Sequence, residues 1–254
     1  MKLLKKISNL LTKFNDFLLV NTGKLLLSVF WGCLAYLIYD IAYLGNWQTL
    51  LWYPFVAFIG WVIISAFYHR ALAHPSWECP DWLKYPFAFF APGLGVTPAI
   101  VWCSLHREHH RHSDIEGKDP HGPAYSWWKN LHILLYNPKF MYSKNLLRDP
   151  LLVAQMKQYW SWFLISVAFF ISVFGASVWA LMVVALTATQ ISINMLGHYP
   201  IGQERKENIK QHILSLIYTP EIYHGQHHDT PNRAKLGAFD VVYYTLIRFF
   251  PHKS

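Results

Sequence analysis

The sequence predicts an all-α integral-membrane protein: four transmembrane helices in two hairpins, with a cytoplasmic helical cap. Two observations predict this fold. Hydrophobic residues make up 54% of the chain and charged residues only 14%, whereas a soluble domain carries about 25% charged residues. Two apolar stretches, residues 25–69 and 158–203, are each about twice the roughly 20 residues that one spanning helix needs. The first contains one charged residue, Asp40, and the second contains none.

Residues 1–24 precede the first apolar stretch and mix lysines with leucines. A signal peptide is disfavoured, because Lys13 and Asp16 interrupt the apolar run and no small-residue cleavage site follows. We expect a basic amphipathic segment that lies on the membrane surface, followed by one domain over residues 25–254.

Each apolar stretch has a turn signal near its middle, Gly45-Asn46 in the first and Gly175 in the second. Each stretch therefore reads as a helical hairpin. The predicted spans lie near residues 25–43, 50–68, 159–174 and 178–197.

The orientation follows from the basic residues. None of the 22 lysines and arginines lies in either hairpin or its turn. By the positive-inside rule, the N-terminus, residues 70–157 and the C-terminus lie together in the cytoplasm.

Residues 82–103 are apolar but are broken by three prolines and two glycines. We expect an interfacial or re-entrant segment. The alternative is a third crossing, which would place His74 and His106 on opposite sides of the membrane.

The three cysteines, Cys33, Cys79 and Cys103, are far apart, and no CxxC pair occurs. Neither a disulfide framework nor a thiolate zinc site is predicted. The net charge of +8 suits anionic lipid or an acidic protein partner equally well, and no nucleic-acid partner is expected.

Three histidine clusters dominate the chemistry of the sequence. The first has the spacing HxxxxH, and the other two have the spacing HxxHH. Residues i, i+3 and i+4 share one face of a helix, so three imidazoles of an HxxHH cluster converge. The cluster members are His69, His74; His106, His109, His110; His224, His227 and His228.

His69 and His74 are five residues apart, about 140° around an α-helix. They converge only if the helix ends between them, and Pro75 favours such an end. A ninth candidate ligand, His198, shares a face of the fourth span with Asn194. The remaining histidines are predicted not to be ligands, with His112 and His121 as the first exceptions, in a supporting role. These histidines are His112, His121, His132, His212 and His252.

Nine histidines exceed the four ligands of a structural zinc and suit two metal ions with four or five ligands each. Imidazole ligation suits zinc, copper, iron or nickel. No Glu-x-x-His pair lies in a predicted span, which separates this site from the carboxylate-bridged di-iron bundles. Composition alone does not select the metal.

Several motifs together resemble the membrane fatty-acid desaturases, in particular the delta-9 stearoyl-CoA desaturase-like branch. The run Trp102–His110 is similar to the second histidine box of that family with its leading tryptophan, and Asp119-Pro120-His121 to the motif that follows it. Asn194 and His198 are similar to an Asn-x-x-x-His pair at the end of the fourth span. The resemblance covers about residues 25–250.

The resemblance implies a non-haem di-iron centre held by the nine histidines and, through water, by Asn194. It implies O2-dependent introduction of a cis double bond into a long-chain acyl group. It also implies an acyl thioester or acyl lipid as substrate, and ferredoxin or cytochrome b5 as electron donor. Four tryptophans are candidates for the acyl slot, with interfacial anchoring as an equal alternative: Trp77, Trp102, Trp127 and Trp128.

Two departures leave the acyl carrier open. The lead-in to the third box, residues 219–223, retains only Glu221 of the family pattern, and Ser104 and Leu105 stand where animal acyl-CoA enzymes carry a basic residue. Two alternatives to desaturation remain: a di-iron lipid hydroxylase or oxygenase, and a membrane metal or haem carrier. A carrier is disfavoured, because the span interiors lack the ionisable groups that transport requires.

Overall fold

The computed structural model describes residues 2–122, 125–197 and 209–254, and the regular elements in these ranges are helices. The one β feature among them is an isolated antiparallel bridge between Trp77 and His252. The all-α prediction is therefore confirmed.

Three helical stretches are long and apolar enough to cross a bilayer: Thr22–Tyr43, Trp47–Ala73 and Ala176–Met195. The first consists of α2 (Thr22–Ile38) and a π-helical turn, and the third lies in α9 (Ala176–Leu196). The second contains α3 (Tyr53–Gly60) between a 3-10 turn and the π-helical run Trp61–Ala73. These stretches identify a membrane protein.

The predicted span at 159–174 coincides with α8 (Tyr159–Phe174), which is apolar but only 16 residues long. A perpendicular spanning helix needs about 20 residues. The fourth crossing therefore stays a prediction.

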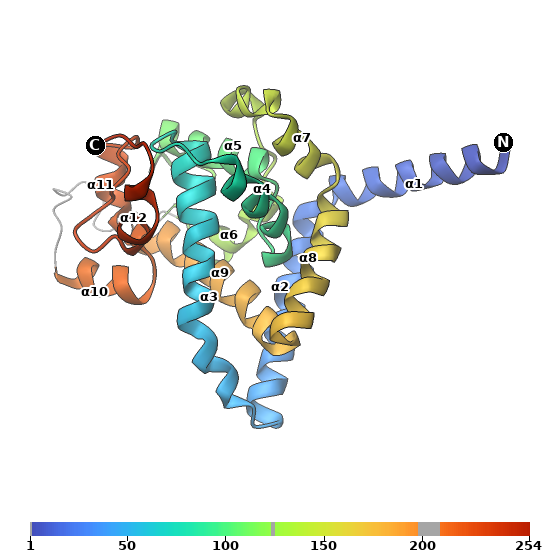
Figure 1. Cartoon of the computed structure of the whole chain (residues 1–254), viewed down its shortest axis with the longest axis horizontal. Helices are drawn as coiled ribbons and strands as arrows, with labels where there is room; N and C mark the ends of the chain where they lie inside the picture. Colours follow the sequence, from blue (N-terminus) through green and yellow to red (C-terminus); the bar gives the residue numbers. More distant parts are fainter. Residues whose placement is uncertain (1, 123–124, 198–208) are drawn as a thin grey trace.

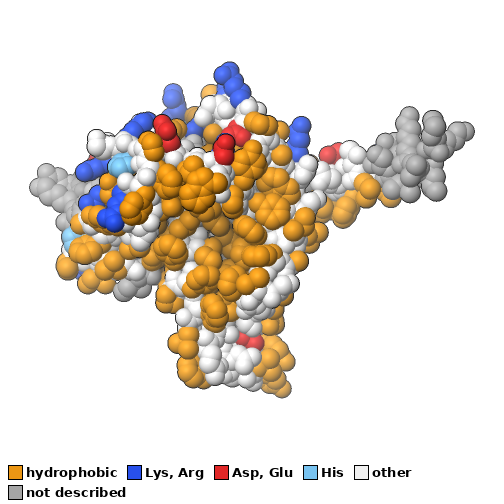
Figure 2. Space-filling model, in the orientation of Figure 1, with side chains coloured by type: hydrophobic (Ala, Val, Ile, Leu, Met, Phe, Trp, Pro, Cys, Tyr) orange, Lys and Arg blue, Asp and Glu red, His pale blue; other side chains and the backbone are white. Residues whose placement is uncertain are grey.

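Helices α2, α3, α8 and α9 form a stem, in which α9 packs against the other three. In Figure 1, α2 and α3 meet at the tip of this stem, and α5, α7 and α11 gather at the opposite end, which we call the cap. Apolar side chains cover the stem in Figure 2, whereas lysines and arginines lie over the cap. The charge asymmetry expected from the sequence is thus an asymmetry of the folded surface.

Helix α1 (Lys2–Val20) extends away from the body of the molecule (Figure 1). Leu10, Leu11, Phe14 and Phe17 are each more than half exposed. Their spacing of one, three and three residues places them on one side of the helix. The interfacial placement of residues 1–24 stays a prediction.

Residues 81–112 fold into α4 (Asp81–Phe90), a 3-10 turn and α5 (Ala99–His112). The backbone between α4 and α5 is satisfied by side chains from α8 and α9. Tyr159 Oη donates to the carbonyl of Val96 at 2.8 Å, and Trp179 Nε1 donates to that of Gly93 at 2.8 Å. Irregular backbone with such partners is tolerated inside a protein. The turn between them packs against α8 and α9, and the interfacial or re-entrant placement of the segment stays a prediction.

Shorter helices complete the chain. Proline at the first position and Asp149 as N-cap begin α7, where the carboxylate accepts from the amide of Leu151 at 3.0 Å. The bounds are α6 (Trp127–Leu131), α7 (Pro150–Lys157), α10 (Ile209–Ile217), α11 (His224–Asp229) and α12 (Val241–Thr245).

Helix α2 passes close to residues 132–135 at Gly23. A Cβ atom at Gly23 would collide with the backbone carbonyl of Leu134, whereas one at Gly32 on the same helix would meet nothing within 4 Å. We predict that Gly23→Ala lowers the free energy of unfolding by about 1–3 kcal/mol through overpacking.

The matched control is Gly32→Ala, which gains helix propensity of up to about 1 kcal/mol and should leave Tm unchanged or slightly raised. Thermal unfolding of both variants in the same detergent measures the difference. Equal Tm values for the two variants would contradict the close approach.

Candidate metal centre

The first histidine box lies at the end of the second candidate span. His74 N donates to the carbonyl of His69 at 2.9 Å, the five-residue hydrogen bond of a π-helix. This wide turn brings the two rings together, with centroids 5.2 Å apart. The helix ends between His69 and His74, as expected, with Ala73 as its last residue and His74 as its C-cap; the unexpected feature is that it widens into a π-helix before it ends.

The second box lies on α5 and the third on α11. Arg107, next to His106, fastens α5 to the end of the first box. Its Nη2 donates to the carbonyl of Leu72 at 2.7 Å and its Nε to that of Ala73 at 2.9 Å. The first two boxes are thus held together by backbone contacts as well as by their imidazoles.

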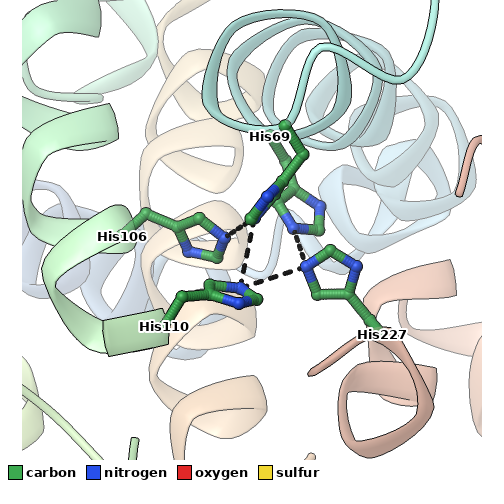
Figure 3. A group of neighbouring side chains, drawn as sticks. His69, His106, His110 and His227 are labelled. Atoms are coloured by element: carbon green, nitrogen blue, oxygen red, sulfur yellow. Dashed lines mark hydrogen bonds between the residues drawn. The ribbon is translucent and has the colours of Figure 1, made fainter. Parts of the chain in front are cut away.

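Five imidazoles form a first group in which the ligand atoms lie within 4.8 Å of one another: His69, His74, His106, His110 and His227. Figure 3 shows the rings of His69, His106, His110 and His227 pointing toward one another from three parts of the chain. The Nε2 atoms are 2.9 Å apart in His69 and His227, and 2.8 Å apart in His74 and His106. His110 Nε2 lies 3.1 Å from that of His74 and of His227.

Hydrogen bonds among the rings do not explain this convergence. A neutral imidazole carries one N–H, so a cluster of Nε2 atoms that all face one another leaves lone pairs opposed in a buried space. A cation between them accepts every lone pair. The residues present therefore fit a metal ion.

A second group brings together His109, His224 and His228, again with ligand atoms within 4.8 Å. The Nε2 atoms of His109 and His228 are 3.0 Å apart. Asn194 on α9 lines the same cavity as His224. His198, the expected ninth ligand, lies outside the described residues.

Carboxylates orient one imidazole of each group. His69 Nδ1 lies 3.2 Å from Glu221 Oε1, and His109 Nδ1 lies 2.8 Å from Asp119 Oδ1. A proton on Nδ1 leaves Nε2 as the ligand atom, so each carboxylate selects the metal-binding tautomer. Sequence reasoning did not assign Glu221 and Asp119 to the site, although both stand in motifs beside the boxes.

The charge states of Glu221 and of three ligand rings agree with this role, whereas burial raises the pKa of Asp119 to about 7. Burial raises the pKa of Glu221, but the hydrogen bond with His69 and the charge of Arg70 outweigh burial and bring that pKa to about 2. Burial, and then the neighbouring imidazoles, lower the pKa values of His74, His106 and His227 well below the ordinary value. At neutral pH these rings are neutral, as metal ligands must be.

An apolar cavity adjoins both groups. His69, His106 and His224 line one part of it, and Gly95 and Val96 line another. Both Thr187 and Asn194 of α9 contribute, so the cavity extends about 10 Å along that helix. No lysine or arginine is among the described residues that line it. Such a slot suits a hydrocarbon chain.

The four tryptophans occupy different places. Trp102 lines the cavity, stacks on His106 with centroids 4.9 Å apart, and donates to Gln190 Oε1 at 3.2 Å. Trp77 is buried in a separate apolar cluster with Trp61. Trp127 and Trp128 are about half exposed. Of the four, only Trp102 is among the residues that line the cavity.

The histidines outside the boxes have other contacts. The His121 ring stacks on His109 at 4.1 Å and lines the cavity. With Asp119, these two rings form a third grouping of possible ligands. His112 lies 3.4 Å from Tyr142 Oη. The remaining three histidines each have a ring nitrogen 2.6–3.1 Å from a main-chain carbonyl or a tyrosine hydroxyl oxygen. They are His132, His212 and His252.

Comparison with known proteins gives a consistent result. Residues 44–236 match the family model of the fatty acid desaturases. Delta-9 acyl-lipid desaturase 2 of Arabidopsis thaliana is 29% identical over 225 residues, which cover 80% of this chain and 71% of that protein. The sn-2 palmitoyl-lipid 9-desaturase of Nostoc sp. (strain 36) is 25% identical over 232 residues, 83% of this chain and 80% of that protein.

We predict that His106→Ala lowers the iron bound per purified chain to about half of the wild-type content or less, because it removes a ligand from the first group. His252→Ala is the matched control, since His252 is exposed and belongs to neither group. Elemental analysis of both proteins, purified in parallel, gives the comparison. Equal iron in the two variants would contradict the assignment.

Proposed function

Because the chain belongs to the fatty acid desaturase family, we propose that it introduces a cis double bond into a fatty acyl chain, with O2 as co-substrate, at a centre that holds two iron ions. The observation that carries this proposal is the convergence of eight described histidines beside an apolar cavity. The chain is accordingly an oxidoreductase of fatty acyl groups.

The two groups of imidazoles divide the ligands. The first group would hold one iron. His109, His224 and His228 would hold the other, with His198 as a further ligand and Asn194 acting through water. Two iron ions bound there would supply the activation of O2 and the removal of two hydrogens from unactivated carbons.

The residues of the chain have two roles: they orient the ligands, and they exclude water. Neutral imidazoles would leave bound ions strongly electrophilic, and Glu221 and Asp119 keep their histidines in the metal-binding tautomer. The apolar walls keep water from the reacting carbons. Trp102, fixed between His106 and Gln190, forms the wall nearest the first group.

The proposed substrate is an acyl chain carried on a membrane lipid. The described cavity lining offers no cation for the phosphates of a coenzyme A. Ser104 Oγ is already occupied, since it donates to the carbonyl of Lys139 at 2.6 Å. The relatives from Arabidopsis and Nostoc carry acyl-lipid and palmitoyl-lipid in their names, together with position nine. We therefore assign the double bond to position nine.

The proposed topology has four crossings, with both termini and the metal centre in the cytoplasm. Two electrons per turnover must come from outside the chain. The lysines and arginines over the cap (Figure 2) would attract an acidic donor of the ferredoxin or cytochrome b5 type.

Expression in a host that lacks its own desaturase tests the proposal. We predict a new monounsaturated acyl chain with its double bond at carbon nine, absent from a His228→Ala control made at equal level. Gas chromatography with mass spectrometry, after derivatisation of the double bond, measures the monoene in the wild type and in the control. Hydroxylated chains in place of the monoene would assign a hydroxylase, and no product from iron-loaded protein with a ferredoxin would contradict the acyl-lipid assignment.

A second prediction tests the cavity. Thr187→Trp places a bulky side chain in the slot, about 10 Å along α9 from Asn194, so product should fall at least tenfold while the iron content stays at the wild-type level. Ile165→Trp, on the exposed side of α8, is the control and should keep both the amount of product and the iron content of the wild type. Lipid profiles and elemental analysis of the same preparations measure the two effects. Unchanged product from Thr187→Trp would place the acyl chain elsewhere.

A further inference from the structure

Arg70 follows His69 directly and has no exposed side-chain surface, and neither has Asp240. Arg70 Nη1 donates to Asp240 Oδ2 at 2.6 Å and to the carbonyl of Ala234 at 2.9 Å, and its Nη2 donates to Ser65 Oγ. A buried guanidinium is tolerated only with such partners. The contacts join the helix of the first box to a segment 170 residues later in the chain.

Asp240 is itself held in place. Its Oδ2 accepts from the amide of Leu236 at 2.9 Å, and its Oδ1 caps α12 by accepting from the amide of Tyr243 at 3.0 Å. The carboxylate therefore has one position, and that position determines where Arg70 lies.

Arg70 transmits this position to the metal centre through Glu221. Arg70 Nη2 lies 3.7 Å from Glu221 Oε1, the same oxygen that faces His69 Nδ1 at 3.2 Å. Thr219 Oγ1 donates to the other oxygen of Glu221 at 2.6 Å. Asp240, Arg70, Glu221 and His69 thus form one continuous chain of buried charge and hydrogen bonds.

The far end of the same segment contacts the other side of the first box. The amide of Lys253 donates to the carbonyl of Ser76 at 2.8 Å, and that of Glu78 donates to the carbonyl of Pro251 at 2.9 Å. Ser76 Oγ in turn donates to the carbonyl of Arg70 at 2.9 Å. His69 and His74 are therefore flanked on both sides by residues that the C-terminal segment binds.

We propose that residues 234–253 are a clamp that holds the first histidine box in its metal-binding geometry, with Arg70 and Asp240 as positioning residues for His69. The inference rests on the proposed metal centre and adds to it a segment that lies almost wholly beyond the family match, which ends at residue 236. The clamp stabilises the wide turn between His69 and His74, and the convergence of the first group depends on that turn.

The test is Asp240→Asn, which keeps the shape of the side chain and an oxygen to cap α12. It replaces the charged oxygen that accepts from Arg70 and from the amide of Leu236 by an NH2 group, which cannot accept. Wild type and variant are loaded anaerobically with ferrous iron. Iron per chain and the rate of iron transfer to an excess of chelator are then measured. Loss of an outer contact of a metal ligand costs roughly 10- to 100-fold in metal affinity, so we expect the variant to lose about half of its iron to the chelator at least tenfold faster.

Three further variants test whether the faster iron release arises from the contacts of Asp240. Asp81→Asn removes an exposed carboxylate on α4 and should match the wild type. Glu221→Gln should resemble Asp240→Asn, and the two together should be no worse than the more severe single variant. Asp119→Asn should speed the release of the other half of the iron, which the second group holds. The double variant with Asp240→Asn should release the iron of both groups faster.

The outcomes distinguish failure of the proposed metal centre from failure of the proposed clamp. A folded wild-type protein that binds no iron overturns the metal centre itself. A wild type with two irons and a monodisperse Asp240→Asn variant that releases both at the wild-type rate overturn the clamp alone. If Asp240→Asn does not fold, truncation after Phe249 removes the contacts to Ser76 and Glu78, and iron release at the wild-type rate from that variant also overturns the clamp.

Discussion

The structure depends on one constraint, the convergence of imidazole nitrogens from three distant segments on one small buried space. Eight histidines meet there, and five of them lie in one group with ligand atoms within 4.8 Å. Buried lone pairs that face one another are unfavourable without a cation. The surrounding contacts are therefore organised around these rings: Arg107 fastens α5 to the first box, and Glu221 and Asp119 select the tautomer of one ring in each group.

The cavity beside the histidines determines which chemistry suits this centre. An apolar cavity runs along α9 and adjoins the histidines. The turn between α4 and α5, supported by Tyr159 and Trp179, supplies one wall of that cavity through Gly95, Val96 and Thr97. A site made of neutral ligands beside an apolar slot is suited to hydrogen removal from a hydrocarbon, because the apolar walls keep water at a distance.

Three of the candidate spans, the charge asymmetry and the histidine boxes were predictable, because hydropathy and HxxHH spacing are local signals. What could not be predicted depends on contacts between distant residues. The π-helical turn that joins His69 to His74 has no sequence signal that separates it from an α-helix ending near Pro75. The partnership of Glu221 with His69 joins residues 152 apart. Likewise, Trp77 and Trp102 look alike in sequence, but packing buries the first in another cluster and places only the second beside the metal centre.

X-ray absorption at the iron edge of the purified protein tests the central claim most directly. We expect two iron ions per chain in a first shell of nitrogen and oxygen, with the outer scattering pattern of imidazole rings and no sulfur. A single haem iron, sulfur ligation, or a chain that binds no iron while folded would contradict it.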